Sequence, residues 1–498
     1  MSASFVVAVI AGYFILLILI SFLTSRKTDS NTFFTGNRQS PWYLVAFGMI
    51  GASLSGVTFI SVPGWVADTQ FTYMQVVLGY LLGYLVIGTI LMPLYYRLKL
   101  VSIYGYLEDR FGFWSYKTGS FYFLVSRVVQ AAFRLFLVAG VLQLAIFDAW
   151  GLPFSVTVII TITLIWLYTF RGGIKTIVWT DTLQTFFMLL AIGIVIYLVS
   201  KDLNLSFGGL VNTVKSSEYS RVFVWEWQPG TNFFKQFFSG AFIAIVMTGL
   251  DQDMMQKNLT CKSIGDAQKN MFWFSIVLVF VNLLFLSMGA LLYIYAQKNG
   301  ITVPEKTDDL FPMLALNHFP TIAGIVFLLG ITAAAYSSAD SALTALTTSF
   351  CVDFLNFQRE ETIAMQRKQR KIRLLVHLGF SVLLFAVIMV FQAINDEAVI
   401  SSLFKAAGYT YGPLLGLFAF GLFTRKEIKD RWVIPVCLIS PILAYLLNIY
   451  SDVLLGGYKF GFEILIVNGL FTFIGLAFIV KGKGAPTDQE SQAVPKTG

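Results

Sequence analysis

The chain has 498 residues, of which 57% are hydrophobic and only 12% carry a charge. Its mean hydropathy of +0.73 lies far outside the range of soluble globular proteins, so we expect a polytopic protein embedded in a lipid bilayer. The net charge of +8 does not indicate a nucleic-acid partner, because the Lys and Arg residues are not gathered into a basic domain.

Apolar stretches long enough to cross the roughly 30 Å hydrocarbon layer recur along the chain. The predicted fold class is therefore an all-α polytopic membrane protein with about thirteen transmembrane helices. The predicted spans lie near residues 4–24, 42–66, 72–96, 118–147, 152–170, 176–200, 233–256, 271–297, 320–355, 374–393, 398–423, 432–450 and 460–480. The first stretch has an uncharged start and no small-residue cleavage site, so we expect it to remain as a helix.

Lys and Arg residues fall in alternate loops, which is the distribution that sets the orientation of membrane proteins. With the N-terminus outside, inward-facing segments hold about 25 of the 35 basic residues. We therefore expect a multi-pass protein of the cell membrane, inner or plasma, with its N-terminus outside and its C-terminus in the cytoplasm.

Two predicted spans contain residues that interrupt helices. The second span carries the segment from Gly51 to Gly56 followed by Pro63, and the seventh carries Gly249 followed closely by Asp251. Broken helices expose backbone carbonyls, which the membrane tolerates only beside a cavity. Because the two breaks are about five helices apart, we expect five plus five helices in two repeats of inverted topology.

A run of small and hydroxyl residues between Gly330 and Ser349 lies inside the ninth predicted span. At 100° per residue, its polar positions share one face within an arc of roughly 120°. The residues on this face are Ala334, Ser337, Ser338, Ser341, Thr344 and Thr348. Such oxygens can hold a desolvated cation, but the same residues also suit close helix packing, with hydroxyls bonded to carbonyls four residues earlier. Asp340 at the edge of the face favours an ion site, because an unpaired buried carboxylate is costly.

Six further segments form a recognisable pattern, and they are Gly51–Gly64, Tyr106–Phe111, Gly172–Gln184, Gly249–Gln252, Ala334–Ser341 and Gly408–Gly416. They extend over helices two to eleven and resemble the sodium/solute symporter family. The resemblance implies a leucine-transporter-like fold and a secondary active symporter that imports a small organic solute by alternating access, with Na⁺ as the coupling ion.

The resemblance also implies the sodium ligands. A primary site would be formed by carbonyls on the broken second helix and by a carbonyl and two hydroxyls on the ninth helix, at Gly51, Leu54, Ala334, Ser337 and Ser338. A second site, found in the sialic acid carriers of the family, would be formed by Asp181, Ser337, Asp340 and Ser341. Asp340 departs from the serine or threonine of that pattern, so we expect altered affinity or pH dependence there. We expect no metal other than sodium.

Polar residues at bilayer depth indicate a substrate cavity. They are Ser53, Ser55, Thr58, Gln75 and Arg134. A permanent cation in mid-helix needs an anion, and a substrate carboxylate is a suitable bidentate partner for Arg134; a protein carboxylate or snorkelling is the alternative. Arg127 is expected to be an interface anchor. The sialic acid carriers resemble this chain at Ser55, Thr58 and Arg134, so the leading substrate is an organic anion such as sialic acid.

A neutral sugar or polyol is the alternative substrate, because the ring-stacking aromatics that it needs are present. They include Tyr73, Tyr80, Tyr336 and Tyr409. Lys405 either meets an anion or anchors its helix at the interface. We expect no enzyme, since no HExxH, P-loop or GxSxG motif appears with supporting partners, and no channel, since neither symmetric subunits nor repeated pore loops are visible.

The predicted organisation has four parts. They are a first helix and cytoplasmic loop over 1–41, an inverted-repeat transport core over 42–424 with repeats at 42–200 and 232–424, two C-terminal helices over 425–480 and a cytoplasmic tail over 481–498. The expected partners are a small-molecule substrate, sodium ions and the bilayer, with no obligate protein partner.

Overall fold

The computed structural model describes residues 3–24, 40–98, 100, 102–169, 174–357, 363–395 and 397–481. Within these residues the chain is helical, and the β structure amounts to two isolated bridges. The main helices are α1 (Ala3–Thr24), α3 (Trp42–Ser53), α4 (Gly56–Gly64), α6 (Tyr73–Val86), α7 (Met92–Leu98), α9 (Phe113–Leu142), α10 (Phe154–Thr169), α11 (Ile174–Asp202), α12 (Phe207–Ser216), α13 (Phe233–Ala244), α14 (Gln252–Asn258), α15 (Ile264–Lys298), α17 (Thr321–Ser349), α18 (Ile363–Ile394), α19 (Val399–Thr410), α20 (Gly412–Phe423), α21 (Val433–Ile449) and α23 (Ile464–Phe478).

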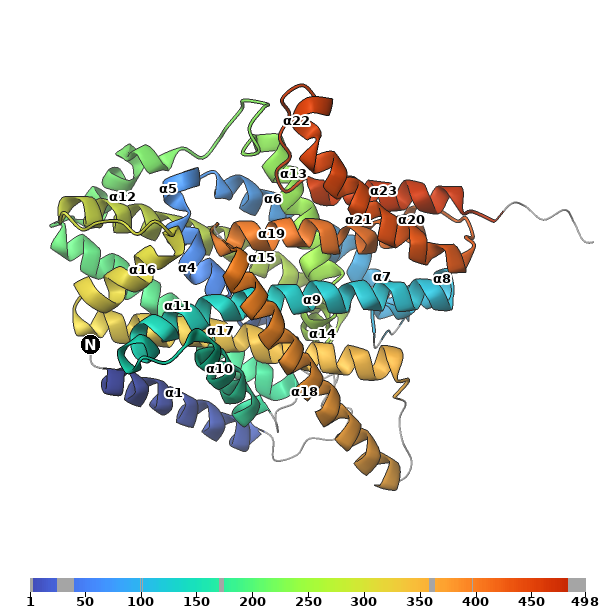
Figure 1. Ribbon diagram of the computed structural model, residues 1–498, viewed down its shortest axis with the longest axis horizontal. Helices are drawn as coiled ribbons and strands as arrows, with labels where there is room; N and C mark the ends of the chain where they lie inside the picture. Colours follow the sequence, from blue (N-terminus) through green and yellow to red (C-terminus); the bar gives the residue numbers. More distant parts are fainter. Residues whose placement is uncertain are drawn as a thin grey trace, which may run out of the picture.

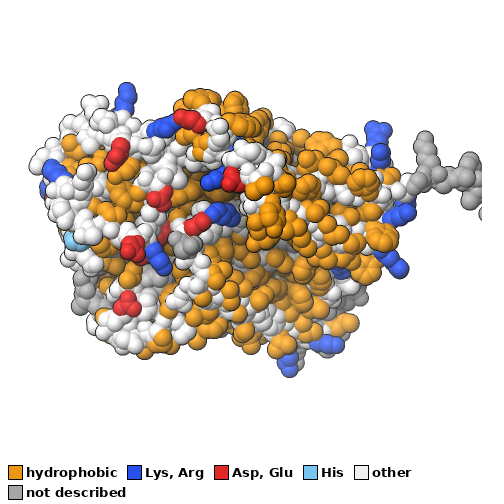
Figure 2. Space-filling model, turned by 45° about the horizontal axis from the view of Figure 1, so that its top comes forward, with side chains coloured by type: hydrophobic (Ala, Val, Ile, Leu, Met, Phe, Trp, Pro, Cys, Tyr) orange, Lys and Arg blue, Asp and Glu red, His pale blue; other side chains and the backbone are white. Residues whose placement is uncertain are grey.

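The described helices are suited to a membrane. Six are long and apolar enough to cross it, and three bent helix pairs pass the same test when each pair is counted as one span. Shorter apolar helices lie at Ser4–Leu19, Phe154–Trp166, Thr321–Ala334 and Ile464–Phe478. Hydrophobic side chains accordingly cover much of the surface seen in Figure 2, where the Asp and Glu side chains in view gather over one part of the molecule and Lys and Arg side chains also lie at its margins. An all-helical membrane protein is therefore confirmed.

Both predicted helix breaks are present. The axes of α3 and α4 differ by 54°, and the helix Phe233–Gly249 meets α14 at 73°. A third bend of 48°, between α19 and α20, was not expected from the sequence, which predicts one uninterrupted span there. Pro413 accounts for this bend, because proline has no N–H to donate and its ring collides with the carbonyl four residues earlier.

The helix α18 begins earlier than predicted. The apolar span at 374–393 corresponds only to its later part, because the helix starts at Ile363 and includes a run of Lys and Arg residues. Hydropathy marks where a helix enters lipid, and a charged extension of the same helix gives no apolar signal. The α18 helix crosses its neighbours obliquely in Figure 1, where α9 and α17 run roughly side by side.

The first break, at Leu54 and Ser55 between α3 and α4, lies next to α11 and α17, which both contact α3. A β-carbon at Gly51 would collide with the hydroxyl of Thr185 on α11. A β-carbon at Gly330 of α17 would lie 2.8 Å from the Phe59 ring of α4. Glycine at these two positions therefore allows the broken helix to approach both neighbours closely.

Candidate functional site

A central cavity of about 90 Å³ lies beside the first break. Its walls come from α3, α4, α6, α9, α13, α14, α15 and α19 and the π-helical turn that follows α13. Its polar lining residues are Ser53, Ser55, Thr58, Tyr73, Tyr80, Tyr84, Arg127, Arg134, Thr248 and Asn282. Four of the five predicted substrate ligands are thus brought together. The cavity is smaller than the roughly 300 Å³ at the lower end of ligand pockets, so entry of a sizeable solute requires the bundle to open.

Arg134 reaches this cavity from the middle of α9. Its guanidinium forms no hydrogen bond or ion pair with any residue that the structure describes, and its Nε atom is buried. Of the alternatives to a substrate ligand, pairing of Arg134 with a protein carboxylate has no support in the described residues. An unpaired cation at this depth can bind an anion that enters the cavity.

Gln75 lies outside the cavity lining, contrary to expectation. Its Nε2 donates to the carbonyl of Thr231 at 2.8 Å, and its Oε1 accepts from the backbone N–H of Val224 at 3.2 Å. The side chain is fully buried. Gln75 therefore fastens the segment before α13 to α6, because its polar atoms satisfy that segment's backbone.

Arg127 is not an interface anchor. It is 3% exposed, its Nη2 bonds Oδ2 of Asp253, and its Nη1 lies 3.6 Å from Oδ2 of Asp251. The same Asp251 oxygen accepts from the hydroxyl of Tyr411 at 3.0 Å, and that hydroxyl accepts from Gln130 at 2.8 Å. This charge cluster therefore ties α9 to the bend at α19 and to the second break, at Leu250 and Asp251 before α14.

Backbone carbonyls at the two breaks have different partners. At the second break, the carbonyls of Gly249 and Leu250 each accept a hydrogen bond at 2.9 Å, from the hydroxyls of Tyr95 and Tyr104 respectively. At the first break, no side chain in the described residues donates to a carbonyl between Gly51 and Leu54. The last carbonyls of a helix lack intrahelical partners, so those of α3 are available to a ligand.

The predicted hydroxyl face of α17 is partly described. The Ser338 hydroxyl donates to the Ala334 carbonyl at 3.2 Å, and both residues are buried. This is the back-bond expected from helix packing, and it also holds two neutral oxygens close together on a helix that contacts α3. The Ser337 side chain lies outside the described residues, so the primary sodium ligands stay a prediction.

At the predicted second sodium site, Asp181 has a partner that was not foreseen. Its Oδ2 accepts from Nζ of Lys257 on α14 at 3.0 Å, and both side chains are at most 2% exposed. The hydroxyl of Ser341 is buried and has no hydrogen-bond partner among the described residues. The Asp340 side chain lies outside them. Of the described groups at this site, the Asp181 carboxylate is therefore already paired, whereas the Ser341 hydroxyl has an oxygen that an ion can use.

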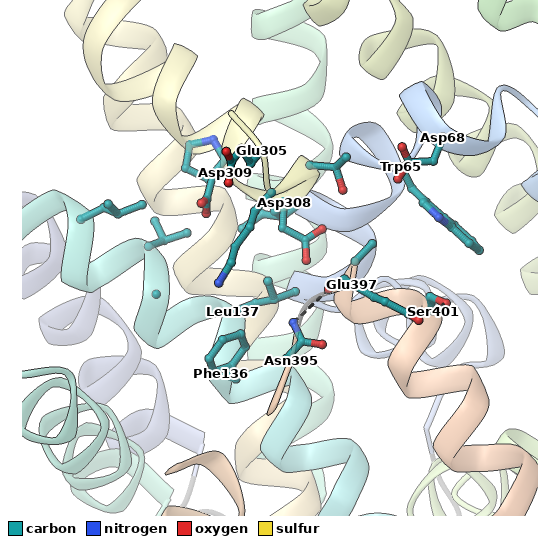
Figure 3. Close-up of a pocket in the computed structure, with 18 of the residues that line it drawn as sticks. Trp65, Asp68, Phe136, Leu137, Glu305, Asp308, Asp309, Asn395, Glu397 and Ser401 are labelled. Atoms are coloured by element: carbon teal, nitrogen blue, oxygen red, sulfur yellow. Dashed lines mark hydrogen bonds between the residues drawn. The ribbon is translucent and has the colours of Figure 1, made fainter. Parts of the chain in front are cut away.

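A larger cavity of about 500 Å³ lies beyond α4, and we call it the acidic cavity. Its charged residues are Asp68, Glu305, Lys306, Asp308, Asp309, Glu397 and Lys405. Figure 3 shows Asn395 next to Glu397, below Asp308, and the Asn395 amide donates to the Glu397 carbonyl at 2.9 Å. Lys405 pairs with Glu397 at 2.5 Å, so its described partner is a protein carboxylate. Desolvation by burial raises the pKa of Asp308 to about 6, although Val399 N–H donates to this carboxylate at 2.9 Å.

Two of the four tyrosines suggested for sugar stacking lie away from the central cavity. Tyr336 is fully buried and packs edge to face on Phe14 of α1, with ring centroids 4.7 Å apart. Tyr409 accepts a hydrogen bond from Asn448 on α21. These two rings therefore serve helix packing.

Three polar residues of the central cavity were missed in the sequence: Tyr84, Thr248 and Asn282. Asn282 had a detectable signal, because it is an uncharged polar residue inside an apolar run of α15. Thr248 directly precedes Gly249 at the second break, and Tyr84 repeats the Tyr80 face one helical turn later.

Comparison with known proteins places this site in a family. The model of the sodium:solute symporter family matches residues 33–429. The sodium/sialic acid symporter SiaT of Proteus mirabilis is 24% identical over 460 residues, which is 89% of both chains. NanT, a sodium/sialic acid symporter of Aliivibrio fischeri, is 24% identical over 83% of this chain and 82% of its own. The human sodium/iodide cotransporter is 23% identical over 83% of this chain and 65% of its own.

Solved structures show the same fold. A Na⁺-coupled sialic acid symporter, in a substrate-bound outward-open state, superposes with a TM-score of 0.79 at 20% identity, covering 96% of this chain and 98% of that one. A nucleobase-cation-symport-1 family transporter in a closed conformation gives a TM-score of 0.53 at 14% identity, covering 91% and 96%. These structures confirm a leucine-transporter-like fold. Because the family match spans both breaks and most of the chain, the protein belongs to the sodium:solute symporter family and is a sodium-coupled membrane symporter.

Proposed function

We propose that this chain imports sialic acid, or a closely related organic anion, together with Na⁺ by alternating access. The observation that carries the proposal is Arg134, an unpaired guanidinium in a cavity that Ser53, Ser55 and Thr58 also line. A carboxylate can accept two parallel hydrogen bonds from a guanidinium, and hydroxyls can serve the remaining oxygens of the solute. The sodium/sialic acid symporters among the relatives support this substrate class.

Sodium binding and solute binding are proposed to share the first break. Na⁺ would be held by the carbonyls of Gly51 and Leu54 together with Ala334, Ser337 and Ser338 of α17. An ion there fixes α3 against α17 and so orients the hydroxyls of the broken helix toward the cavity. Because coupling between two binding sites is reciprocal, the solute must tighten Na⁺ binding by the same factor.

A neutral sugar is not favoured as the solute. It would leave the Arg134 guanidinium without an anion, and two of the four candidate stacking tyrosines lie elsewhere in the bundle. The family and the relatives named above are transporters, which points away from an enzyme.

A second sodium at Asp181, Ser337, Asp340 and Ser341 remains our proposal, with Lys257 as an additional member of the site. The ammonium group already balances one carboxylate, so the ion would depend on Asp340 and the free Ser341 hydroxyl. The sodium Hill coefficient of uptake tests this site in Asp181→Ala and Asp340→Ser variants. A coefficient that stays at the wild-type value in both variants removes the second sodium.

The finer architecture is proposed as well. If the shorter apolar helices also span, the chain has about thirteen transmembrane helices, with inverted repeats at 42–200 and 232–424 and two further helices within 425–480. From the excess of basic residues in the inward-facing segments we infer that the N-terminus is outside and the C-terminus inside. The tail lies outside the described residues from 482 onward. A C-terminal fusion that reports cytoplasmic or external location checks the orientation.

Uptake of labelled N-acetylneuraminate into proteoliposomes tests the main proposal. We expect accumulation driven by an inward Na⁺ gradient and absent in choline or potassium. Arg134→Gln should weaken binding about 30-fold or more, and Arg134→Lys should retain part of it, because an ammonium keeps the charge without the bidentate fork. Lys405→Gln, which removes a positive charge outside the central cavity, is the matched control and should change binding little. Equal accumulation in choline would refute sodium coupling, and an unaffected Arg134→Gln variant would refute the anion site.

A further inference from the structure

Asn282 is a buried polar residue of the central cavity whose hydrogen bonds are incomplete. It is 2% exposed, and its Nδ2 donates to the carbonyl of Leu278 at 2.8 Å within α15. Its Oδ1 has no partner among the described residues. Leu278, one turn earlier on the same helix face, also lines the cavity, so the unpartnered oxygen is on the cavity side of α15. An amide oxygen in this position is an acceptor that awaits a donor.

A hydroxyl pair on α6 provides the complementary group. The hydroxyls of Tyr73 and Tyr80 are 3.1 Å apart, and both residues line the same cavity as Asn282. Two hydroxyls carry two protons, and the bond between them uses only one. The other proton can be donated to a solute in the cavity, because no further hydrogen bond of this pair occurs in the described part of the chain.

The cavity therefore contains three kinds of polar group that are not satisfied within the described protein. Arg134 supplies a cation, Asn282 supplies an acceptor and the tyrosine pair supplies a donor. An alcohol group both donates and accepts a hydrogen bond, so it matches the last two together. A solute with a carboxylate but no hydroxyl would satisfy the arginine and leave the amide and the tyrosine unpaired on burial.

We propose that Asn282 and the Tyr73–Tyr80 pair form a hydroxyl-recognition subsite, which selects hydroxylated carboxylates over simple ones. This inference rests on the proposed function, since Arg134 must hold the carboxylate of the same solute. The subsite lies on a wall of the cavity that is separate from the hydroxyl residues of the broken helix.

Calorimetric binding to the purified full-length protein in saturating Na⁺ tests the subsite. The probes are N-acetylneuraminate and its single-deoxy analogues, each lacking one hydroxyl. Asn282→Leu, which has nearly the same shape, should weaken N-acetylneuraminate about 10-fold or more. One deoxy analogue should bind the wild-type protein about as weakly as N-acetylneuraminate binds Asn282→Leu. The affinity for that analogue should be nearly the same in the wild type and in Asn282→Leu. Tyr80→Phe should weaken N-acetylneuraminate and lose its effect for the same analogue.

Several outcomes would overturn the subsite. If Asn282→Leu weakens binding of N-acetylneuraminate and of every analogue by the same factor, Asn282 acts through packing. If Asn282→Leu weakens binding of none of them, Asn282 does not contact the solute. Sodium-induced thermal stabilisation without solute shows whether the variants are folded, and Tyr80→Phe carries the test if Asn282→Leu is not. Absence of wild-type binding to N-acetylneuraminate defeats the proposed substrate instead. The comparison then passes to L-lactate against propionate, where equal affinities or no binding of either acid overturns the subsite.

Discussion

The two helix breaks of the bundle use the same backbone feature in opposite ways. At the second break, tyrosine hydroxyls satisfy the carbonyls of Gly249 and Leu250, and Asp251 is paired with Arg127. At the first break, the carbonyls at the end of α3 receive no side-chain donor in the described residues, and the adjoining hydroxyls face a cavity. One break is therefore internally satisfied, whereas the other is left with unmet hydrogen-bonding capacity that an ion and a solute can fill.

The arginines of α9 reflect the same division. Arg127 and Arg134 are two helical turns apart and both line the central cavity, yet Arg127 pairs with two carboxylates and Arg134 forms no ion pair within the described residues. A buried cation with partners holds elements together, and one without partners is available to an external anion.

The largest expected effect comes from removing the charge that completes the second break. Arg127→Met leaves Asp251 and Asp253 buried without their cation, so the free energy of unfolding should fall by about 3–5 kcal/mol. Thermal unfolding of the detergent-purified protein measures the loss. Arg134→Met is the matched control and should cost far less stability, because it strands no described carboxylate. Equal losses in the two variants would show that the second break does not depend on its ion pairs.

The next effect concerns the acidic cavity at the far end of α4, where the Asp308 carboxylate accepts a hydrogen bond from the N–H of Val399. Burial raises the folded-state pKa of Asp308 from 3.8 to about 6. An acid with a raised folded pKa binds more protons when folded than when unfolded, so its contribution to stability falls as pH rises from about 4 to 6 and stays low above that. Two pKa units correspond to about 3 kcal/mol as an upper limit.

Asp308→Asn should therefore raise the unfolding temperature at pH 7.5 and flatten its decline between pH 4 and 6, since the amide oxygen can still accept from Val399. Unfolding scans across that pH range give the comparison. The exposed carboxylate of Glu427 serves as the control in Glu427→Gln, which should leave the decline unchanged. A wild-type decline that persists in Asp308→Asn would assign it to other groups.

The close approach of α3 to α11 gives the third prediction. Gly51→Ala places a methyl group against Thr185, so we expect a loss of about 1–3 kcal/mol in unfolding free energy and weaker Na⁺ binding. Gly193→Ala on α11 is the control, because no heavy atom lies within 4 Å of its added β-carbon, and it should be neutral or slightly stabilising. Sodium-dependent thermal shifts read out both effects, and a Gly51→Ala variant that behaves like the control would refute the close contact.

Much of the fold was readable from the sequence, because apolar length and the glycine and proline residues of the two breaks act locally. The partners of buried polar and charged side chains could not be predicted from the sequence in this way. Gln75 was predicted in the cavity, but its position is decided by one carbonyl and one N–H of a loop about 150 residues later. Lys257 meets Asp181 across a separation of 76 residues, and nothing near either residue indicates the pairing. The presence of polar residues at bilayer depth therefore identified candidate site residues, whereas tertiary packing decided which of those side chains remain unpaired.

The smallest expected effect tests the tyrosine hydroxyls at the second break. Tyr95→Phe removes the donor to the Gly249 carbonyl but keeps the ring, so the free energy of unfolding should fall by about 1 kcal/mol with no change in solute affinity. Tyr80→Phe makes the same chemical change in the central cavity, where the hydroxyl pairs with that of Tyr73 rather than with the backbone, and should reverse this pattern. Paired unfolding and binding measurements distinguish the two. If Tyr95→Phe weakened solute binding as much as Tyr80→Phe while leaving stability intact, the second break would belong to the solute site, and the contrast between the breaks would fail.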